Sequence, residues 1–373
     1  MPEQRVGFGN ISNQPEWSLL LSCARTRITP KHSEMIRAAV AQKPDWLALI
    51  RLAMRHEVMP LLYRNLEQVC PDAVPPNIFG PLHARYRERA KEAQCRAEEL
   101  VRILALFQEQ AIPAVPYKGP TLAQRLYGDV SLRDFGDLDI MILERDVPRA
   151  QELIRRQGYR FAYLKNEDIL AAYVRANREL QFCHPDGKAL ELHWRFAMRE
   201  ACVKKDPERF LERLERISLA GAQVPSLPLE VYLLVLSMHA TKHKWKKLKL
   251  ICDVSEILGQ PGLDWQYVIR EAEALGLKRM LAVGILLAEG LFDMVAPVEL
   301  AQELKKDGAA QALAGEVRQS LFEQPDKNWH REAEYRFQFE IRERFEDRAR
   351  MFFWHWWPRV TRRFVGLPDW YAE

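Results

Sequence analysis

The chain has 373 residues, of which 48% are hydrophobic and 28% are charged. A chain of this length can form two or three compact units with ordinary hydrophobic cores. The formal net charge of +4 is small for the length, so charge alone neither requires nor excludes a nucleic-acid partner, and no hydrophobic run approaches the length of a membrane-spanning helix.

The N-terminus and the cysteines indicate the cellular compartment. Residues 1–10 lack the apolar core of a signal peptide. The six cysteines show no Cys-x-x-Cys spacing, which argues against a zinc knuckle or a disulfide framework and indicates reduced thiols. We therefore expect a cytoplasmic protein.

The first third of the chain has a helical pattern. Residues 15–108 follow the helical period, with a break at 71–81 and a long charged helix at 83–108. We expect residues 1–108 to form an N-terminal helical region.

A short strand and a short helix follow. Residues 112–117 form an apolar run that fits a strand, and residues 120–127 fit a helix that begins with proline and ends before Gly128. Between them lie Lys118 and Gly119. A glycine at such a junction lets a phosphate group approach the free amides at the start of the helix, and Lys118 adds a positive charge. The segment therefore predicts a phosphate-binding loop.

Two further features affect this loop. Pro120 has no amide hydrogen, so one phosphate contact is either lost or supplied by Thr121. Arg133 offers a second cation whose forked guanidinium could reach the same phosphates.

Two carboxylates follow on the next expected strand, residues 137–143. The aliphatic residues Leu138, Ile140 and Ile142 share one face, and Asp137 and Asp139 share the other. Two residues along a strand span roughly 6.6 to 7 Å, so both carboxylates can converge on a metal centre. Their hard oxygen ligands favour Mg²⁺ or Mn²⁺. The alternative is a solvated strand edge with helix-capping acids.

A third acid lies in an expected hairpin. Residues 179–184 and 189–196 read as its two strands, with Asp186-Gly187 as the turn. Glu191 lies in the middle of the second strand, and it is either a third metal ligand or part of a polar outward face. His193 shares the face of Glu191 and is a candidate hydrogen-bonding partner for a metal ligand. A crossover helix at 147–157 precedes the hairpin, and we expect residues 109–200 to form the catalytic core.

The remaining sequence is again mainly helical. We expect a charged helix around 206–217, a break at 225–228 and a second helical region that reaches about residue 324, so that residues 201–325 form a C-terminal helical domain. Within it, residues 229–239 and 248–258 are apolar enough to belong to the core.

A histidine pair and a basic run occur in this region. His239 and His243 have the spacing of a zinc pair on one helix face, although no glutamate lies between them. Alternatively Lys242, His243 and Lys246 form a basic wall over a nucleotide, or His239 is a packing residue. The lysine-rich run 242–249 is either a nucleic-acid patch or a solvated helix face.

The last expected unit, residues 326–373, combines a charged helix at 332–350 with an aromatic and basic tail at 351–364. The tail suits a peripheral membrane contact, an aromatic clamp on a base or an acceptor, or a helix that packs on the core or on a dimer partner.

Several short motifs together resemble a known family. They are Lys-Gly-Pro-Thr-Leu at 118–122, Leu-Tyr-Gly-Asp at 126–129, Leu-Arg-Asp at 132–134, Gly-Asp-Leu-Asp-Ile at 136–140 and Glu-Leu-His-Trp-Arg at 191–195. This combination resembles the uncharacterised nucleotidyltransferase family of the polymerase-β-like superfamily, which is often found beside bacterial exopolysaccharide and peptide-modification genes. Residues 52–66 and 239–258 also resemble that family, so the resemblance covers roughly 45–260. The loop and acid motifs are similar, too, to nucleotidyltransferase toxins of type IV toxin–antitoxin systems.

The resemblance implies an α+β fold, with a small mixed β-sheet nucleotidyltransferase core flanked by N-terminal and C-terminal helical regions. Three carboxylates beside a phosphate loop favour an in-line displacement assisted by two Mg²⁺ or Mn²⁺ ions. In this interpretation Asp137 and Asp139 bridge both ions and Glu191 holds one of them. A nucleoside monophosphate passes from a nucleoside triphosphate, ATP for example, to a hydroxyl of a small molecule, a protein or an RNA, and pyrophosphate leaves.

Seven residues are expected to bind the nucleotide: Lys118, Gly119, Thr121, Arg133, Lys242, His243 and Lys246. Two other functions compete with the enzymatic one. The first is a catalytically silent binding or scaffold protein in a cell-surface polysaccharide or peptide-modification pathway, which Pro120 favours. The second is a membrane-associated interaction protein that depends on the tail.

Overall fold

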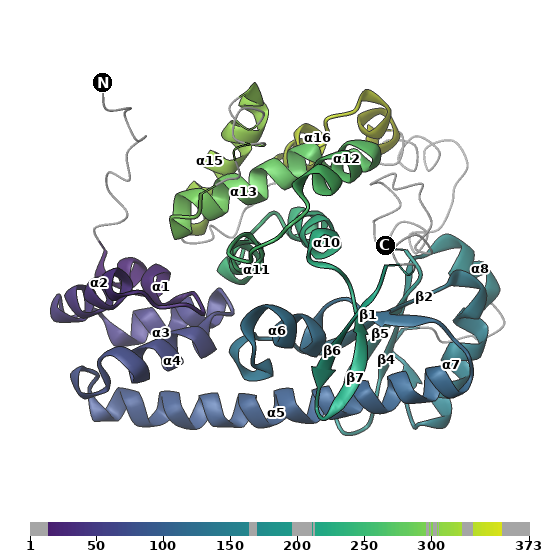
Figure 1. The fold of residues 1–373 in the computed structure, drawn as a ribbon, viewed down its shortest axis with the longest axis horizontal. Helices are drawn as coiled ribbons and strands as arrows, with labels where there is room; N and C mark the ends of the chain where they lie inside the picture. Colours follow the sequence, from purple (N-terminus) through teal and green to yellow (C-terminus); the bar gives the residue numbers. More distant parts are fainter. Residues whose placement is uncertain are drawn as a thin grey trace.

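The chain forms a mixed sheet that is preceded and followed in the sequence by helices, as expected (Figure 1). The computed structural model describes residues 14–163, 170–195, 211, 213–295, 298, 300, 304, 306–322 and 331–352. The expected tail at 351–364 therefore lies almost entirely outside the described residues. No helix in the described ranges combines the length and the apolar character needed to cross a membrane.

The N-terminal helices pack at one end of a long helix. They are α1 (Pro15–Cys23), α2 (Pro30–Ala41), α3 (Trp46–Arg55) and α4 (Met59–Val69), followed by the short 3-10 turn η1 (Pro71–Ala73) and α5 (Pro76–Glu109). At 1.5 Å per residue, the 34 residues of α5 extend for about 50 Å. Helix α5 thus reaches from the N-terminal helices to the sheet (Figure 1).

The expected break at 71–81 is wrong in its second half, because α5 begins at Pro76 and contains Pro81. Proline inside a helix removes one backbone hydrogen bond. Packing between α4 and α5 opposes this cost: Leu82 is buried, and the Tyr86 ring stacks on Tyr63 with 4.6 Å between ring centroids. Tertiary contacts therefore continue the helix where local preference would end it.

The central sheet contains five strands within the described residues. They are β1 (Ala114–Pro116), β2 (Asp137–Ile142), β3 (Arg160–Phe161), β4 (Glu179–Cys183) and β5 (Ala189–His193), in the spatial order β1-β2-β5-β4-β3. Strands β2 and β5 are parallel, and the other neighbouring pairs are antiparallel. The expected strands and the 179–196 hairpin are confirmed to within a few residues, and Gly187 adopts a φ of 90° in its turn.

Short helices connect the strands. They are α6 (Gly119–Tyr127), η2 (Val130–Leu132), η3 (Glu144–Asp146), α7 (Val147–Arg156) and α8 (Leu170–Ala176). Gly128 ends α6 in the left-handed conformation, and Gly158 follows α7 with a φ of 91°. Both predicted helix ends are thus confirmed.

The sheet has one apolar and one polar face. The apolar face packs on the second half of α5 and on α7, and contributes Leu138, Ile140, Ile142, Leu180, Phe182, Leu190 and Leu192 to a hydrophobic core. The alternation along β2 and β5 directs the acidic residues to the opposite face. The predicted separation of the aliphatic and acidic residues of β2 is confirmed.

Of the expected charged helix around 206–217, Leu211 is helical, residues 206–210 and 212 lie outside the described residues, and the end from Glu215 is wrong. Residues from Glu215 form a hairpin instead, β6 (Glu215–Leu219) and β7 (Ala222–Ser226). Its turn has positive φ at both Ala220 (45°) and Gly221 (80°), the backbone of a tight hairpin turn. The buried side chains Leu219 and Val224 join the core under the sheet, so tertiary packing favours strands here.

The C-terminal helices contact α6 and the N-terminal helix α1. They are α10 (Leu229–Lys242), α11 (Leu248–Leu258), α12 (Trp265–Leu275), α13 (Lys278–Phe292), α15 (Gly308–Phe322) and α16 (Arg331–Glu340). Their buried residues form one continuous core with those of α1–α4 and α6. The two helical regions, which we expected as separate units, therefore share a hydrophobic core.

The expected single helix 332–350 is wrong, because α16 ends at Glu340 and a second helical stretch covers 345–352. Arg279 explains the interruption. Its side chain donates to the carbonyl oxygen of Glu340 at 2.8 Å, and its backbone amide donates to the Glu343 carboxylate at 2.7 Å. These bonds satisfy backbone and side-chain groups at the end of α16.

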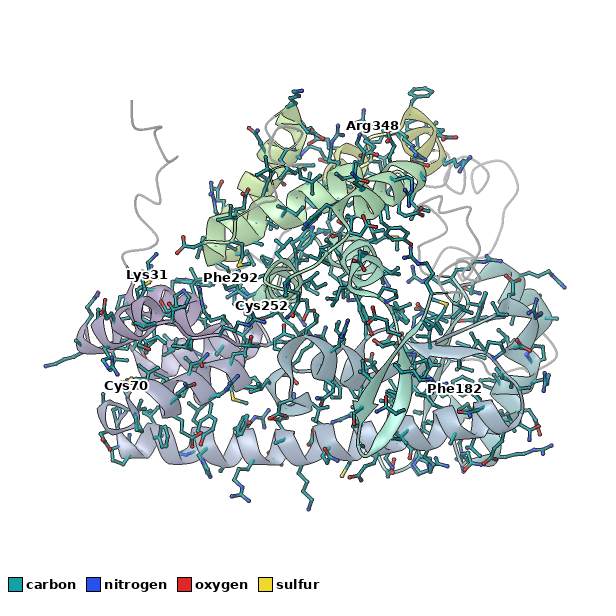
Figure 2. All side chains as sticks on the ribbon, viewed as in Figure 1. Lys31, Cys70, Phe182, Cys252, Phe292 and Arg348 are labelled. Atoms are coloured by element: carbon teal, nitrogen blue, oxygen red, sulfur yellow. The ribbon has the colours of Figure 1, made fainter. Side chains whose placement is uncertain are left out.

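The five described cysteines are free. Figure 2 shows two of them on different helical layers, Cys70 after α4 and Cys252 on α11. Burial raises the pKa of the Cys252 thiol well above its usual value, so this thiol is a packing group.

Candidate active site

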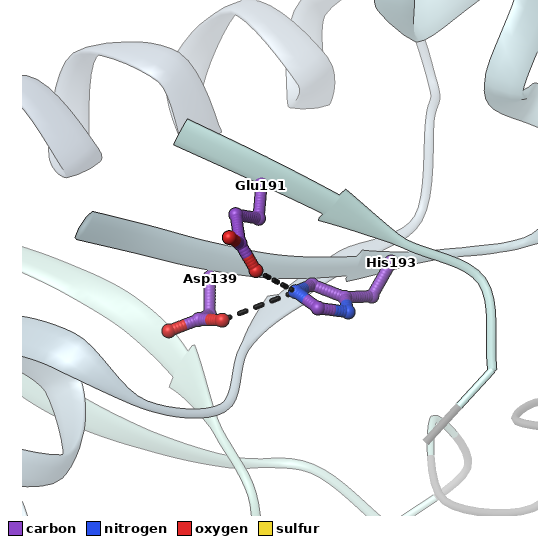
Figure 3. A group of neighbouring side chains, drawn as sticks. All are labelled: Asp139, Glu191 and His193. Carbon is purple, nitrogen blue, oxygen red and sulfur yellow. Dashed lines mark hydrogen bonds and ion pairs between the residues drawn. The ribbon is translucent and has the colours of Figure 1, made fainter. Parts of the chain in front are cut away.

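Three side chains on the polar face of the sheet form a compact group. Asp139 on β2 and Glu191 on β5 are direct partners in the parallel pairing, and His193 lies two residues further along β5. Ligand atoms of the three residues all lie within 4.8 Å of one another (Figure 3). Two carboxylates and an imidazole are the donor types of a divalent metal site.

His193 bridges the two carboxylates. Its Nε2 lies 3.1 Å from Asp139 Oδ1 and 3.1 Å from Glu191 Oε2 (Figure 3). Its Nδ1 lies 3.5 Å from Glu179 Oε2. Burial alone would lower the pKa of His193, but the hydrogen bonds to Asp139 and Glu191 raise it. The imidazole therefore offsets negative charge between the acids.

Lys118 provides a second positive charge. Its Nζ lies 2.8 Å from Asp139 Oδ1, and both side chains are largely buried. The amide of Tyr117 donates to the carbonyl of Asp139, which continues the pairing of β1 with β2 and places Lys118 beside that carboxylate. Burial would raise the pKa of Asp139, but Lys118 and His193 hold it well below its usual value. Asp139 is therefore an ionised carboxylate.

Asp137 has a different environment. Burial and the nearby Asp139 charge raise the pKa of Asp137 to about 6. Asp137 does not belong to the three-residue group, but it lines the adjoining cavities described below. The Asp137 carboxyl lies near Asp139 and Glu191, and a bound cation would offset the charge of the three carboxylates. The residues present therefore fit a divalent metal ion.

Gly119 is required by the geometry of the loop. It has a φ of 62°, and a Cβ atom at this position would lie 3.1 Å from the backbone oxygen of Asp137. The loop therefore runs directly against the start of β2. Pro120 follows as the second residue of α6, so the first turn of that helix lacks one amide hydrogen.

Arg133 is held in a buried ion pair. Its Nε and one terminal nitrogen each lie 2.8 Å from an oxygen of Asp253 on α11, and Tyr127 also donates to Asp253 at 2.7 Å. Arg133 thus joins the loop before β2 to the C-terminal helices. Neighbouring Asp134 is held by Arg89 of α5 at 3.2 Å. The loop 129–136 is fixed on both sides.

A cavity of about 470 Å³ opens beside this loop. Its acidic wall includes Asp137 and Asp139, and its backbone wall includes Gly119 and Gly136. Its cations come from four different segments of the chain: Arg89, Lys118, Arg133, Lys246, Lys247 and Lys249. We call this space the first cavity. Its predominance of cations suits a polyphosphate.

A second cavity of about 300 Å³ shares Asp137 with the first, and α10 forms part of its wall. It is lined by Glu191, His193 and polar residues of β4, and by apolar residues of α10 and α13, namely Val235, Met238 and Met280. Four residues line both cavities: Lys118, Asp137, His239 and His243. The two cavities therefore meet at Asp137 and Lys118.

The basic run 242–249 is not one helix face, because α10 ends at Lys242 and α11 begins at Leu248. Between them Lys244 and Trp245 have left-handed φ values of 52° and 54°. The buried Trp245 ring occupies space that a Cβ at Gly284 would enter, since such an atom would lie 2.6 Å from the ring. This turn separates the lysines, which line different cavities.

The structure distributes the expected nucleotide-binding residues unevenly. Lys118, Gly119, Arg133, His243 and Lys246 all line the first cavity. In contrast, Lys242 lines only the second cavity. Thr121 is fully buried and lines neither, and its hydroxyl has no hydrogen-bond partner among the described residues.

His239 and His243 lie with ring centroids 4.7 Å apart. They are not part of the metal-like group found among the described residues. Burial and the charges of Lys242 and Lys118 lower the pKa of His243 to about 4. The pKa of His239 is also well below its usual value, chiefly because the ring is buried. Both imidazole rings are therefore neutral, and both line the cavities.

Several site residues were not recognised in the sequence. Glu57 follows α3 and contacts Lys247 and Lys249, with a φ of 55°. Glu179 and Gln181 lie on β4, where Gln181 donates to Glu191 at 2.8 Å. The period-two alternation of β4 would have placed both residues on the face of Glu191. No local signal points from Glu57 to the distant lysines.

The model of the uncharacterised nucleotidyltransferase family matches residues 42–293. This span covers both cavities' sheet residues and the helices α10 and α11. The chain therefore belongs to the uncharacterised nucleotidyltransferase family. No curated protein and no solved structure gives a significant match.

Proposed function

We propose that the protein transfers a nucleoside monophosphate from a nucleoside triphosphate to a hydroxyl acceptor and releases pyrophosphate. The observation that best supports this reaction is the junction of the two cavities. A basic cavity suited to a polyphosphate and a second, mixed cavity meet beside Asp137, Asp139 and Glu191. Such a junction brings an α-phosphorus and an acceptor oxygen together.

In this proposal Asp137, Asp139 and Glu191 hold Mg²⁺ or Mn²⁺ and His193 orients the carboxylates. When bound, the metal supplies charge stabilisation at the transferring phosphoryl group. Lys118, whose ammonium contacts Asp139, turns toward the triphosphate and offsets charge that develops on the leaving pyrophosphate. The Gly119 amide, His243 and Lys246 line the same cavity and position the phosphates.

The covalent step forms one bond and breaks another. The acceptor hydroxyl oxygen bonds to the α-phosphorus, and the bond from that phosphorus to the β-phosphate oxygen breaks. The hydroxyl proton passes to the Glu191 carboxylate, which accepts hydrogen bonds from Gln181 and His193 in this structure. The Arg133 guanidinium remains bidentate to Asp253, so Arg133 positions the loop that lines the first cavity.

The test is label transfer from each α-³²P nucleoside triphosphate, with Mg²⁺ or Mn²⁺, in the presence of cell extract. Wild-type protein should release pyrophosphate and label an acceptor, and Asp139→Asn and Glu191→Gln should each abolish both signals. Glu144→Gln is the matched control, because Glu144 is an exposed carboxylate paired with Arg195 outside both cavities. Equal activity of all variants would refute the assignment of the acids.

A silent binding protein is the second candidate. It is supported by Pro120, which removes an amide from the first turn of α6, and by Lys118, which already neutralises Asp139. In that case nucleoside triphosphates would bind with unchanged affinity to the Asp139→Asn variant, and no pyrophosphate would form in any condition.

A further inference from the structure

The second cavity contains a cation, Lys242, for which the described part of the chain provides no ion-pair partner. Lys242, at the end of α10, lines this cavity and makes no hydrogen bond or ion pair with any residue that the structure describes. It is partly buried. Burial and the charge of Arg178 lower the pKa of Lys242. A partly desolvated ammonium beside another cation is a favourable position for an anion.

Most of the other charges of this cavity have partners in the described ranges, with Asp137 as the exception. Arg178 contacts Glu179 at 2.9 Å, and Glu191 interacts with Gln181 and His193. Arg342, which is also buried at this cavity, donates to Gln338 at 3.2 Å. Glu179 and Glu191 therefore have protein partners, whereas Lys242 has none among the described residues. The lining contains four cations, Lys118, Arg178, Lys242 and Arg342, and three acids, Asp137, Glu179 and Glu191.

The size of the cavity limits its occupant. About 300 Å³ is at the lower end of the range for small-molecule sites. Val235, Met238 and Met280 provide an apolar surface for a carbon skeleton, and Glu191, a member of the three-residue group, also lines this cavity. A compact molecule fits these dimensions better than a folded RNA or a protein segment.

We propose that the second cavity binds the acceptor, and that the acceptor is a small hydroxyl compound with an anionic group held by Lys242. The anionic group is a phosphate monoester or a carboxylate. That the bound molecule is the acceptor rests on the proposed function, but the anion site itself does not. Lys242 then serves the acceptor, and Lys246, in the first cavity, serves the nucleotide.

Anion binding can be measured on the metal-free, full-length protein by ligand-observed NMR titration at constant ionic strength. Four probes with a three-carbon skeleton separate the possibilities: glycerol 3-phosphate, glycerate, glycerol and 3-amino-1,2-propanediol. We expect one of the two anionic probes to bind about tenfold or more tighter than glycerol. The stronger of the two identifies phosphate or carboxylate as the preferred group.

Two matched variants assign the site. Lys242→Gln should reduce binding of the anionic probe to the level of glycerol and leave nucleoside triphosphate affinity within twofold. Lys246→Gln should weaken nucleotide binding and leave the affinity for the anionic probe within twofold. Lys242→Glu should reverse the preference toward 3-amino-1,2-propanediol, which a general loss of folding would not do.

Three results would overturn the inference: similar affinities for all four probes, no effect of Lys242→Gln, or label transfer to RNA or protein alone. The proposed function fails separately. If no nucleoside triphosphate binds but the anionic probe binds through Lys242, transfer is refuted and the anion site stands. If triphosphates are turned over without any preference for an anionic acceptor, only this inference is refuted.

Discussion

Arg133 and Asp253 form a two-pronged ion pair in the interior, with both contact distances at 2.8 Å and side chains that are 4% and 0% exposed. The pair connects the loop before β2 with α11, two segments 120 residues apart in the chain. Because the loop lines the first cavity, this contact links the stability of the C-terminal helices to the shape of the site.

Removal of one partner should be strongly destabilising, because the other charge would remain buried without compensation. We expect Arg133→Met to lower the free energy of unfolding by about 3–5 kcal/mol. The double variant Arg133→Met/Asp253→Leu should lose less than the sum of the two single variants. Urea denaturation of all four proteins measures this coupling, and strictly additive losses would contradict it.

The glycines at the two ends of α6 provide a matched test of the loop. Both have positive φ, 62° at Gly119 and 73° at Gly128, so alanine should cost about 1–2 kcal/mol at either position. Only at Gly119 would the new Cβ also press on the Asp137 backbone, at 3.1 Å.

We therefore expect Gly119→Ala to reduce nucleotide turnover at least tenfold, since small displacements of reacting groups are costly. Gly128→Ala should retain turnover, because nothing lies within 4 Å of its Cβ position. Thermal unfolding and turnover should be measured together. A similar loss of turnover in both variants would show that strain, and not the contact with Asp137, is responsible.

The three-residue group of Asp139, Glu191 and His193 predicts that a bound metal ion stabilises the folded protein. Mg²⁺ or Mn²⁺ should raise the Tm of the wild-type protein, and Asp139→Asn should remove the increase, because binding to the folded state alone stabilises it. Glu144→Gln is again the control. An undiminished increase in the Asp139→Asn protein would place the ion elsewhere.

The pH dependence of metal binding follows from Asp137, whose pKa is raised to about 6 by burial and by Asp139. Above pH 6 the carboxylate is ionised and binding is strongest; as the pH falls through 6, protons compete and affinity declines. Titrations with Mn²⁺ between pH 5 and pH 8 measure this slope. Asp137→Asn should flatten it, and a slope that persists in the variant would assign it to another group.

His56 should make stability sensitive to acid. Burial and the nearby Arg55 charge lower the pKa of His56 to about 4. Its Nδ1 accepts from the Leu248 amide at 3.3 Å, and its ring packs on Trp17. The unfolded chain binds a proton near pH 6.5 whereas the folded chain does not, so stability is complete above pH 6.5 and declines toward pH 4.

The contribution of His56 to the free energy of unfolding falls by about 3 kcal/mol as the pH is lowered from 6.5 to 4. Other groups add their own pH dependence, so the difference between wild-type and His56→Gln is the informative quantity. The variant should be less stable near neutral pH, and its disadvantage should shrink as the pH falls. A constant difference from pH 7 to pH 4.5 would contradict the assignment.

Local sequence patterns predicted the strands on which the candidate acids lie. The alternation of β2 and the Asp186-Gly187 turn were sufficient for the strands that hold Asp139 and Glu191. The family resemblance is confirmed by the family match over residues 42–293. Two facts depend on long-range packing and could not be predicted locally: the Arg133 guanidinium binds Asp253, and Lys242 and Lys246 line different cavities.

Other differences have a similar origin. The β6–β7 hairpin depends on two consecutive residues with positive φ, Ala220 and Gly221, and alanine gives no signal for that conformation. Helix α5 continues through Pro81 because its side chains pack on α4. In both places contacts between distant segments outweigh local propensity.

The parallel pairing of β2 with β5 has a consequence for comparing members of this family. Asp139 and Glu191 face each other because their strands are aligned, and the chain between them, which includes α7 and β4, only has to return to the same edge. Insertions or deletions in that connection should leave the acids together, whereas shifting one strand by a single residue would turn its acid toward the apolar core. A member that keeps the acids is therefore better recognised by the residues that flank each one than by the interval that separates them.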